Sequence, residues 1–355
     1  MNFNIKMNNY NLMLMLLLCI FIIIFSMIYF ENKRQRHFEN MENYYKTRPK
    51  INTLYKDDNN VEISELSDYG KCLIINNEIQ LCSKKENIYH EMIVHFPTQY
   101  ISKNIENVVI VGGGDLMTLR EVMKYKTIKK VYMLELSETI VELCKEYFNQ
   151  NDFSDDNRVE IIYGDANKSI DDIIRIHKED IDMVIVDTTE DNEANLPIDT
   201  PSFFYKCFLL LNETGILVKN GIGFKQLFEE YDDLDTITYK INIPYFQDLY
   251  TFVIASKKSN KIKKHNIDHK KWNSYNIQTQ VYNIKDHSSY IYYDEYSVGH
   301  NNDNKVSYKD YKSETGNVLL TDKNIMEENM YLFEDDNIEK NNEIIEDDIN
   351  EDLFV

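Results

Sequence analysis

The chain has 355 residues and a formal net charge of -21, about half of which lies from Asp322 onward. The locally basic stretch 257–271 lacks the interleaved aromatic residues of a nucleic-acid platform, so we expect no nucleic-acid partner. The cysteines form an odd set without a close pair, which weighs against a disulfide framework or a zinc site and agrees with a cytosolic enzyme. They are Cys19, Cys72, Cys82, Cys144 and Cys207.

Residues 1–10 form a short N-terminal tail, and the next segment, Asn11–Phe30, carries no charged side chain. A helix of this length can cross a bilayer, so we expect a single-pass membrane anchor at 11–30. The segment offers no small-residue cleavage site of a signal peptide. The positive-inside rule places the catalytic part in the cytosol, because Lys33, Arg34 and Arg36 follow directly. A buried core helix is the alternative interpretation.

A linker, 31–50, leads to a small β-strand domain, 51–95, in which short apolar runs alternate with turn residues. One such run, Lys71–Ile75, is followed by Asn76 and Asn77. Asparagine accepts positive φ, so this pair can close a two-residue hairpin. The pattern predicts a small β-hairpin module before the main domain.

The main domain, 96–298, begins with an apolar strand, a glycine turn, a helix and a second strand, all within Asn107–Glu135. The turn contains Gly112, Gly113 and Gly114, which allow a ligand to approach the main chain. Glu135 ends the second strand, where a carboxylate can accept hydrogen bonds from both ribose hydroxyls. This order of elements predicts a nucleoside-cofactor site.

Further strands follow in an α/β order. Val159–Tyr163 precedes Gly164 and Asp165, and Asp182–Val186 delivers Asp187. Each of these strands places an acid at its C-terminal edge, where open parallel sheets bind ligands. Later elements are a helix at 203–211 and strands at 215–218 and 249–255. They predict a mostly parallel sheet, followed by an acidic disordered tail at 299–355.

The chemistry of the glycine turn distinguishes between two kinds of cofactor. The turn lacks the spaced glycines that seat a pyrophosphate on a helix N-terminus, and it carries Asp115 instead. A carboxylate repels phosphate and attracts an amine or a sulfonium. The fold class we predict is therefore α/β, Rossmann-like and of the methyltransferase type, with a ligand related to S-adenosylmethionine.

From about Leu54 to Tyr293 the chain resembles the polyamine aminopropyltransferases, that is, spermidine synthase and its relatives. Several separated motifs occur in the order of that family. They are Ile88–His95 (IYHEMIVH), Gly112–Glu121 (GGGDLMTLRE), Gly164-Asp165-Ala166, Asp187-Thr188-Thr189-Glu190, Ile243-Pro244-Tyr245, and Tyr282-Asn283 with His287. The resemblance implies transfer of an aminopropyl group from decarboxylated S-adenosylmethionine to a diamine, most simply putrescine, without a metal and by an enzyme that forms a homodimer.

The resemblance also implies roles for single residues. Asp187 would act as the base, and the acceptor amine would be bound by Tyr89, Glu190, Gln80 and Tyr245. The donor would be bound by Gly112, Gly113, Gly114, His90, Asp115, Glu135, Asp165 and Ala166. Asp115 would neutralise the aminopropyl ammonium, Glu135 would bind the ribose, and Asp165 would take the adenine amino group.

Two rival functions stay open, and the second is supported by Leu116 and Met117, which replace a usual Gly-Gly, and by the altered residues after Glu190. One rival is an S-adenosylmethionine-dependent methyltransferase, although Asp115 would lie close to the carboxylate of that cofactor. The other is a catalytically silent nucleoside-binding scaffold.

Overall fold

The computed structural model describes residues 50–150, 152–153, 155–189, 198–221, 228, 231, 233–246, 249–262 and 267–291. The predicted membrane anchor, 11–30, and the predicted acidic tail, 299–355, lie outside these residues. So do the N-terminal tail, 1–10, and all of the linker except its last residue. Within the described part of the chain, no helix has the length and apolarity needed to cross a bilayer.

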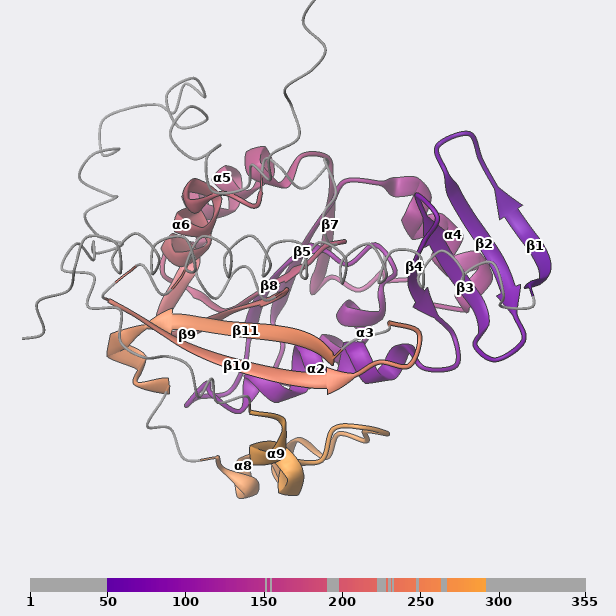
Figure 1. The fold of residues 1–355 in the computed structure, drawn as a ribbon. Helices are drawn as coiled ribbons and strands as arrows, with labels where there is room; N and C mark the ends of the chain where they lie inside the picture. The colour runs from indigo at the N-terminus through magenta and orange to yellow at the C-terminus, as the bar shows by residue number, and fades with distance from the viewer. Residues whose placement is uncertain are drawn as a thin grey trace, which may run out of the picture. The chain divides into compact units, whose positions relative to one another are not determined.

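The first part of the chain folds into a four-stranded antiparallel sheet, as the hairpin prediction requires (Figure 1). Its strands are β1 (Lys50–Lys56), β2 (Val61–Leu66), β3 (Gly70–Ile75) and β4 (Glu78–Cys82). Asn76 and Asn77 close the β3–β4 hairpin with φ angles of 52° and 66°. Positive φ at both central residues matches the right-handed twist of the flanking strands. The predicted Asn-Asn turn is therefore confirmed.

The cysteine prediction was wrong for one pair, because Cys72 and Cys82 form a disulfide between β3 and β4. The physical reason is a bulge. Counting outward from the turn, regular pairing would place Leu81 opposite Cys72, but the register shifts between Leu73 and Ile74. Gln80 is the additional residue of β4, and Cys82 moves opposite Cys72. Cysteine usage therefore no longer argues for a cytosolic catalytic domain. The other described cysteines, Cys144 and Cys207, are free and buried, as predicted.

The second sheet has seven strands in the order β10-β11-β9-β8-β5-β6-β7. Five of them, from β7 to β9 across the sheet, are parallel, and β11 and β10 continue it in antiparallel pairing. Their bounds are β5 (Asn107–Gly112), β6 (Lys130–Glu135), β7 (Val159–Tyr163), β8 (Ile181–Asp187), β9 (Leu211–Asn220), β10 (Leu234–Asn242) and β11 (Leu249–Lys257). The predicted mostly parallel sheet is confirmed, although β10 was not predicted. Because parallel strands end at a common edge, Gly112, Glu135 and Asp187 come together there.

Helices cover both faces of this sheet, with α5 and α6 on one side and α2 and α3 on the other (Figure 1). The α-helices are α2 (Glu86–Thr98), α3 (Met117–Met123), α4 (Glu138–Phe148), α5 (Ala166–His177), α6 (Pro201–Leu210), α8 (His269–Tyr275) and α9 (His287–Tyr290), and the 3₁₀ helices are η2 (Lys258–Asn260) and η4 (Ile284–Asp286). Side-chain caps begin several of them, as when Ser137 accepts the Ile140 N–H and Thr200 accepts that of Phe203. Helix α2 carries two sets of polar side chains. One set contacts α3, and the other reaches the carboxyl edge of the sheet.

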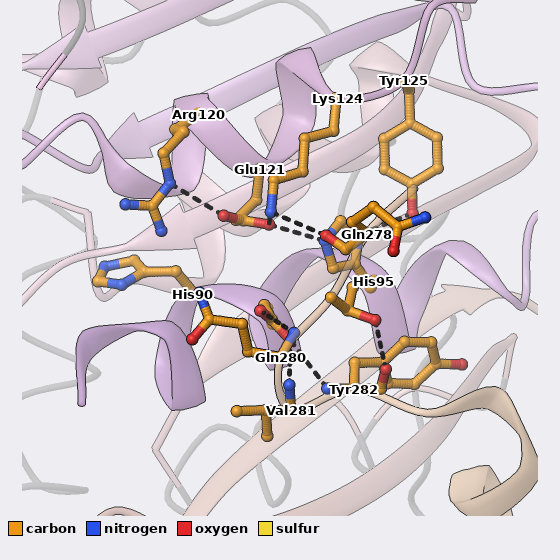
Figure 2. Close-up of polar contacts among 12 residues, drawn as sticks. His90, His95, Arg120, Glu121, Lys124, Tyr125, Gln278, Gln280, Val281 and Tyr282 are labelled. Carbon is orange, nitrogen blue, oxygen red and sulfur yellow. Dashed lines mark hydrogen bonds and ion pairs between the residues drawn. The ribbon is translucent and has the colours of Figure 1, made fainter. Parts of the chain in front are cut away.

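One polar set, which we call the support network, joins α2 to α3 and consists of His95, Thr98, Glu121, Lys124 and Tyr125. Figure 2 labels all of these residues except Thr98. The Glu121 carboxylate lies 2.8 Å from Nε2 of His95 and 2.5 Å from Nζ of Lys124. Tyr125 hydrogen-bonds both Nδ1 of His95 and Oγ1 of Thr98. Burial acts to raise the pKa of Glu121, but His95 and Lys124 outweigh it and lower that pKa to about 2. Burial lowers the pKa of His95, against the raising effect of Glu121.

Glu91 attaches the end of the main domain to the same helix. Its carboxylate accepts the backbone N–H groups of Gln280, Val281 and Tyr282 at 2.8, 2.7 and 2.9 Å (Figure 2 shows this segment). The Tyr282 hydroxyl lies 2.9 Å from Nδ1 of His287 in turn. Thus Glu91 and the segment Tyr282-Asn283 with His287, all part of the family resemblance, serve the framework of the domain.

Candidate functional site

The glycine turn lies directly against the end of β8. A Cβ atom on Gly112, which has φ +81°, would lie 2.2 Å from the backbone oxygen of Asp187. Glycine is therefore required at this close approach. The Gly113 N–H donates to the same oxygen at 2.8 Å. A Cβ on Gly114 would lie 2.9 Å from the Glu135 carboxylate. The turn thus brings the main chain beside two of the predicted site carboxylates.

The two residues that depart from the family pattern adapt to this turn. Leu116 takes a left-handed conformation with φ 65° and ψ 2°, and it is completely buried. A side chain in this region costs roughly 1–2 kcal/mol, which the glycine of the family pattern would avoid. Met117, also buried, begins α3 and packs in a cluster with residues of the small sheet, including Ile63 and Leu81. The loop thereby has a hydrophobic attachment to the small sheet.

Asp187 ends β8 and is the centre of the polar cluster. The Tyr89 hydroxyl, from α2, donates to its Oδ1 at 2.5 Å, and the Thr118 hydroxyl, from α3, donates to its Oδ2 at 2.5 Å. Burial and the nearby charge of Asp115 raise the pKa of Asp187, against the lowering effect of His90 and the two hydroxyls. A carboxylate whose pKa moves toward neutrality is suited to accept a proton.

Asp115 is held by a chain of alternating charges. Its Oδ1 accepts the Met117 N–H at 2.7 Å, and its Oδ2 lies 3.1 Å from Nε2 of His90. The other ring nitrogen of His90 lies 2.8 Å from Glu86, which accepts two 2.9 Å hydrogen bonds from Arg120. Burial would lower the pKa of His90, but Asp115 and Glu86 outweigh it and raise that pKa well above its ordinary value. His90 is therefore an imidazolium that donates from both nitrogens.

Glu135 ends β6, two strand positions from Asp187 along the same sheet edge. It is 8% exposed, and the Ser137 N–H donates to its Oε1 at 2.8 Å. Burial, together with the charges of Asp115 and Asp187, raises the pKa of Glu135 to about 7. We call Asp115, Glu135 and Asp187 the carboxylate cluster; His90 lies 3.1 Å from Asp115 and also acts on the pKa of Asp187.

Asp165 and Ala166 lie at the next strand end, after β7. Asp165 caps α5 by accepting the Asn167 N–H at 2.9 Å, and Ala166 is the first residue of that helix. The Gly164 N–H donates to the backbone oxygen of Glu135 at 2.9 Å. The predicted adenine-binding segment is therefore joined to the predicted ribose-binding residue.

Of the four predicted acceptor residues, Tyr89 lies against Asp187. The other three differ in their surroundings. Tyr245 is 1% exposed beside Tyr69 and Phe246, and its hydroxyl approaches the Cys82 backbone without making a hydrogen bond. The Gln80 amide donates to the Glu78 carbonyl at 3.2 Å, so it turns along its own strand. Glu190 lies outside the described residues, and its role stays a prediction.

Three of the side chains resemble a metal site in geometry. His90, Asp115 and Asp187 each offer a ligand atom, and these atoms lie within 4.8 Å of one another. Two of the three, Asp115 and Asp187, are carboxylates, which also suit an ammonium or a sulfonium.

Sequence reasoning missed several of these residues. Glu86, Thr118 and Arg120 were not predicted, although Glu86 precedes His90 by four residues and therefore shares its face of α2. The four-residue spacing was the signal from which the Glu86–His90 contact could have been predicted. Thr118 and Arg120 lie in the quoted motif Gly112–Glu121, but nothing in the sequence shows that they would reach Asp187 and Glu86.

Comparisons with known proteins agree with the geometry. A family model described as the spermine/spermidine synthase domain matches residues 86–266. The polyamine aminopropyltransferase of Clostridium beijerinckii is 31% identical over 266 residues, which covers 71% of this chain and 91% of the relative. That of Clostridium botulinum strain Eklund 17B is 31% identical over 284 residues, covering 76% and 98%.

Solved structures show the same fold. A spermidine synthase in complex with the transition state analogue AdoDATO is 23% identical, covers 76% of this chain and 90% of its own, and superposes with a TM-score of 0.60. The spermidine synthase of Thermotoga maritima, also 23% identical, covers 76% and 88% with a TM-score of 0.56.

Proposed function

The chain belongs to the spermine/spermidine synthase family and is a polyamine aminopropyltransferase, and we propose that it transfers the aminopropyl group of decarboxylated S-adenosylmethionine to putrescine. The observation that carries this proposal is the carboxylate cluster, Asp115, Glu135 and Asp187, gathered at one sheet edge beside the glycine turn. Both substrates are cationic, and this edge has an excess of negative charge to attract them.

Donor binding uses the side of the site formed by the glycine turn. Glu135 accepts hydrogen bonds from the ribose hydroxyls, Asp165 takes the adenine amino group, and Asp115 neutralises the aminopropyl ammonium. His90 orients Asp115, because its Nε2 donates to Oδ2 while the Met117 N–H donates to Oδ1. The structure that binds AdoDATO has the same fold, which supports a donor of this kind.

The reaction is a single in-line displacement. The amine nitrogen attacks the aminopropyl carbon next to the sulfonium, a C–N bond forms as the C–S bond breaks, and neutral methylthioadenosine leaves. The proton lost by the nitrogen goes to Asp187, whose raised pKa favours acceptance. Tyr89 and Thr118 fix the two carboxylate oxygens, so one lone pair of this base can face the amine.

The acceptor is held by residues around Asp187. Tyr89 and Tyr245 supply aromatic surface, and Glu190 and Gln80 supply polar groups at the resemblance-based positions. The Gln80 Nε2 donates to the Glu78 carbonyl, so its Oε1 is the atom that can accept from the amine. We further propose that residues 11–30 anchor the enzyme to a membrane, that its catalytic domain lies in the cytosol, and that it forms a homodimer. Membrane fractionation of the tagged chain would test the anchor.

The test is release of methylthioadenosine by the full chain from decarboxylated S-adenosylmethionine, with putrescine, agmatine, spermidine and cadaverine offered separately. We expect turnover with putrescine and its loss in D187N. If the nucleoside binds but no amine is turned over, the chain is a silent binding protein and the proposed activity is wrong.

A further inference from the structure

A buried amide at the end of β9 lies beside the proposed acceptor pocket. Asn220 is 2% exposed, and its Nδ2 donates to the Thr188 backbone oxygen at 3.0 Å and to the Tyr250 hydroxyl at 2.7 Å. A backbone carbonyl can only accept, so the nitrogen of the amide has to face Thr188. The orientation of the Asn220 amide is therefore fixed by its surroundings, and Oδ1 points the other way.

This Oδ1 has no hydrogen-bond partner among the described residues, although it is buried. Nearly all buried polar atoms in folded proteins are paired, and an unpaired acceptor costs free energy. Asn220 is thus an exception that needs an explanation. A ligand that donates a hydrogen bond would supply one.

The neighbours of Asn220 indicate the chemistry of that ligand. The Tyr250 ring stacks on Phe246 at 5.0 Å and meets the edge of Tyr89 at 5.4 Å, and Tyr89 donates to Asp187. Aromatic faces next to an acceptor oxygen suit an ammonium, which donates hydrogen bonds and is attracted to π-systems. The adjacent cation, Lys219, is paired with Asp199 at 3.3 Å and donates to the Thr188 hydroxyl at 3.2 Å.

We propose that Asn220 is a specificity-determining residue whose Oδ1 accepts a hydrogen bond from the second, non-reacting ammonium of the acceptor diamine. This inference rests on the proposed function. Asp187 receives the attacking nitrogen, while contacts through Tyr89 and Tyr250 connect it to Asn220, whose amide also donates to the adjacent residue Thr188. The site thereby recognises an acceptor by its far nitrogen as well as by its reacting one.

The test compares two acceptors that differ only at the far end, putrescine and n-butylamine, with the full chain at saturating donor. In N220L, loss of the hydrogen bond to Thr188 should lower kcat/KM for both amines. Loss of Oδ1 should lower kcat/KM for the diamine alone. We expect the ratio of kcat/KM for putrescine to that for n-butylamine to fall about tenfold or more. In N212L, which removes an asparagine at the other end of β9 that donates to Asp182, we expect the wild-type ratio.

The possible outcomes separate the two proposals. Equal losses for both amines in N220L would mean that Asn220 only supports the Thr188 loop, and the inference would be overturned while the transferase stands. A folded wild type that turns over neither amine would overturn the proposed function and the inference together. Should N220L fail to fold, N220S gives the same ratio with a smaller perturbation, and an unchanged ratio there also overturns the inference.

Discussion

Two polar clusters, the support network and the carboxylate cluster, lie beside helices α2 and α3 and differ in their balance of charge. In the support network, Glu121 is 1% exposed and is surrounded by His95, Arg120 and Lys124, and its pKa falls to about 2. In the carboxylate cluster, the pKa values of Glu135 and Asp187 rise instead. The first cluster is complete without a ligand, whereas the second has negative charge in excess. The difference teaches that the same two helices form a stabilising cluster between themselves and also contact, through Tyr89, His90 and Thr118, a cluster whose unmet charge suits a cationic substrate.

The sharpest test of this comparison is D187N, set against D182N on the same strand. We expect D187N to lower kcat by about 10²–10⁴-fold, as for loss of a general base, without lowering thermal stability, since it removes a charge repelled by Asp115. Asp182, at the other end of β8, accepts the N–H groups of Glu106 and Asn107. D182N should therefore lower the melting temperature and leave kcat within a few fold. The reverse pattern would contradict the comparison.

The second prediction concerns the support network. E121Q breaks a buried, hydrogen-bonded set of charges and should cost about 3 kcal/mol of unfolding free energy in urea denaturation. The exposed pair Glu142–Lys145 provides the control, and E142Q should cost less than about 1 kcal/mol.

The effect of E121Q should also depend on pH. The pKa of Glu121 is depressed from 4.5 to about 2, so its contribution is complete above pH 4.5 and is lost as the pH falls toward 2. A difference between E121Q and wild type that persists undiminished at pH 2 would refute this account.

The third prediction follows from Glu135. Its folded pKa of about 7 lies above the ordinary 4.5, so its ionisation lowers the stability of the free protein as the pH rises from 4.5 through 7. The carboxylate is the form that accepts both ribose hydroxyls. Affinity for methylthioadenosine, measured by calorimetry, should therefore rise by up to roughly tenfold between pH 6 and pH 8. E135Q should remove this dependence, while the exposed E138Q should retain it.

The smallest effect is expected from T118V. The Thr118 hydroxyl lowers the pKa of Asp187, so its removal should move the acidic limb of the kcat/KM profile to higher pH by up to about one unit. The matched substitution T98V, in the support network, should leave that limb in place. Equal shifts in the two variants would show that the clusters are not separable.

Much of the fold could be predicted because its signals are local. Apolar strands that each end in a turn and an acid define β5 to β8, and Val159–Tyr163 matches β7 at both ends. The Asn-Asn turn depends on φ preferences that single residues carry. β10 was missed, since its alternation is broken by polar residues on a half-buried edge strand.

The sequence predicted those site residues that lie in the family motifs at recognised positions. His90, Asp115 and Asp187 come together as the resemblance implies, whereas Thr118 and Asn220 depend on how α3 and β9 pack against β8. Such contacts arise from tertiary structure and leave no spacing in the sequence. The Cys72–Cys82 pair was missed for the same reason, because a register shift decides it.

The bulge in β4 has a consequence for how this enzyme can change over evolutionary time. Gln80 is the residue that β3–β4 pairing does not require, since Ile79 and Leu81 already face Ile74 and Leu73. A substitution at Gln80 therefore leaves the register, the disulfide and the apolar contacts of the small sheet intact. The position that the family resemblance assigns to the active site is thus also the one where the hairpin tolerates variation best, and acceptor preference can drift there without loss of the framework.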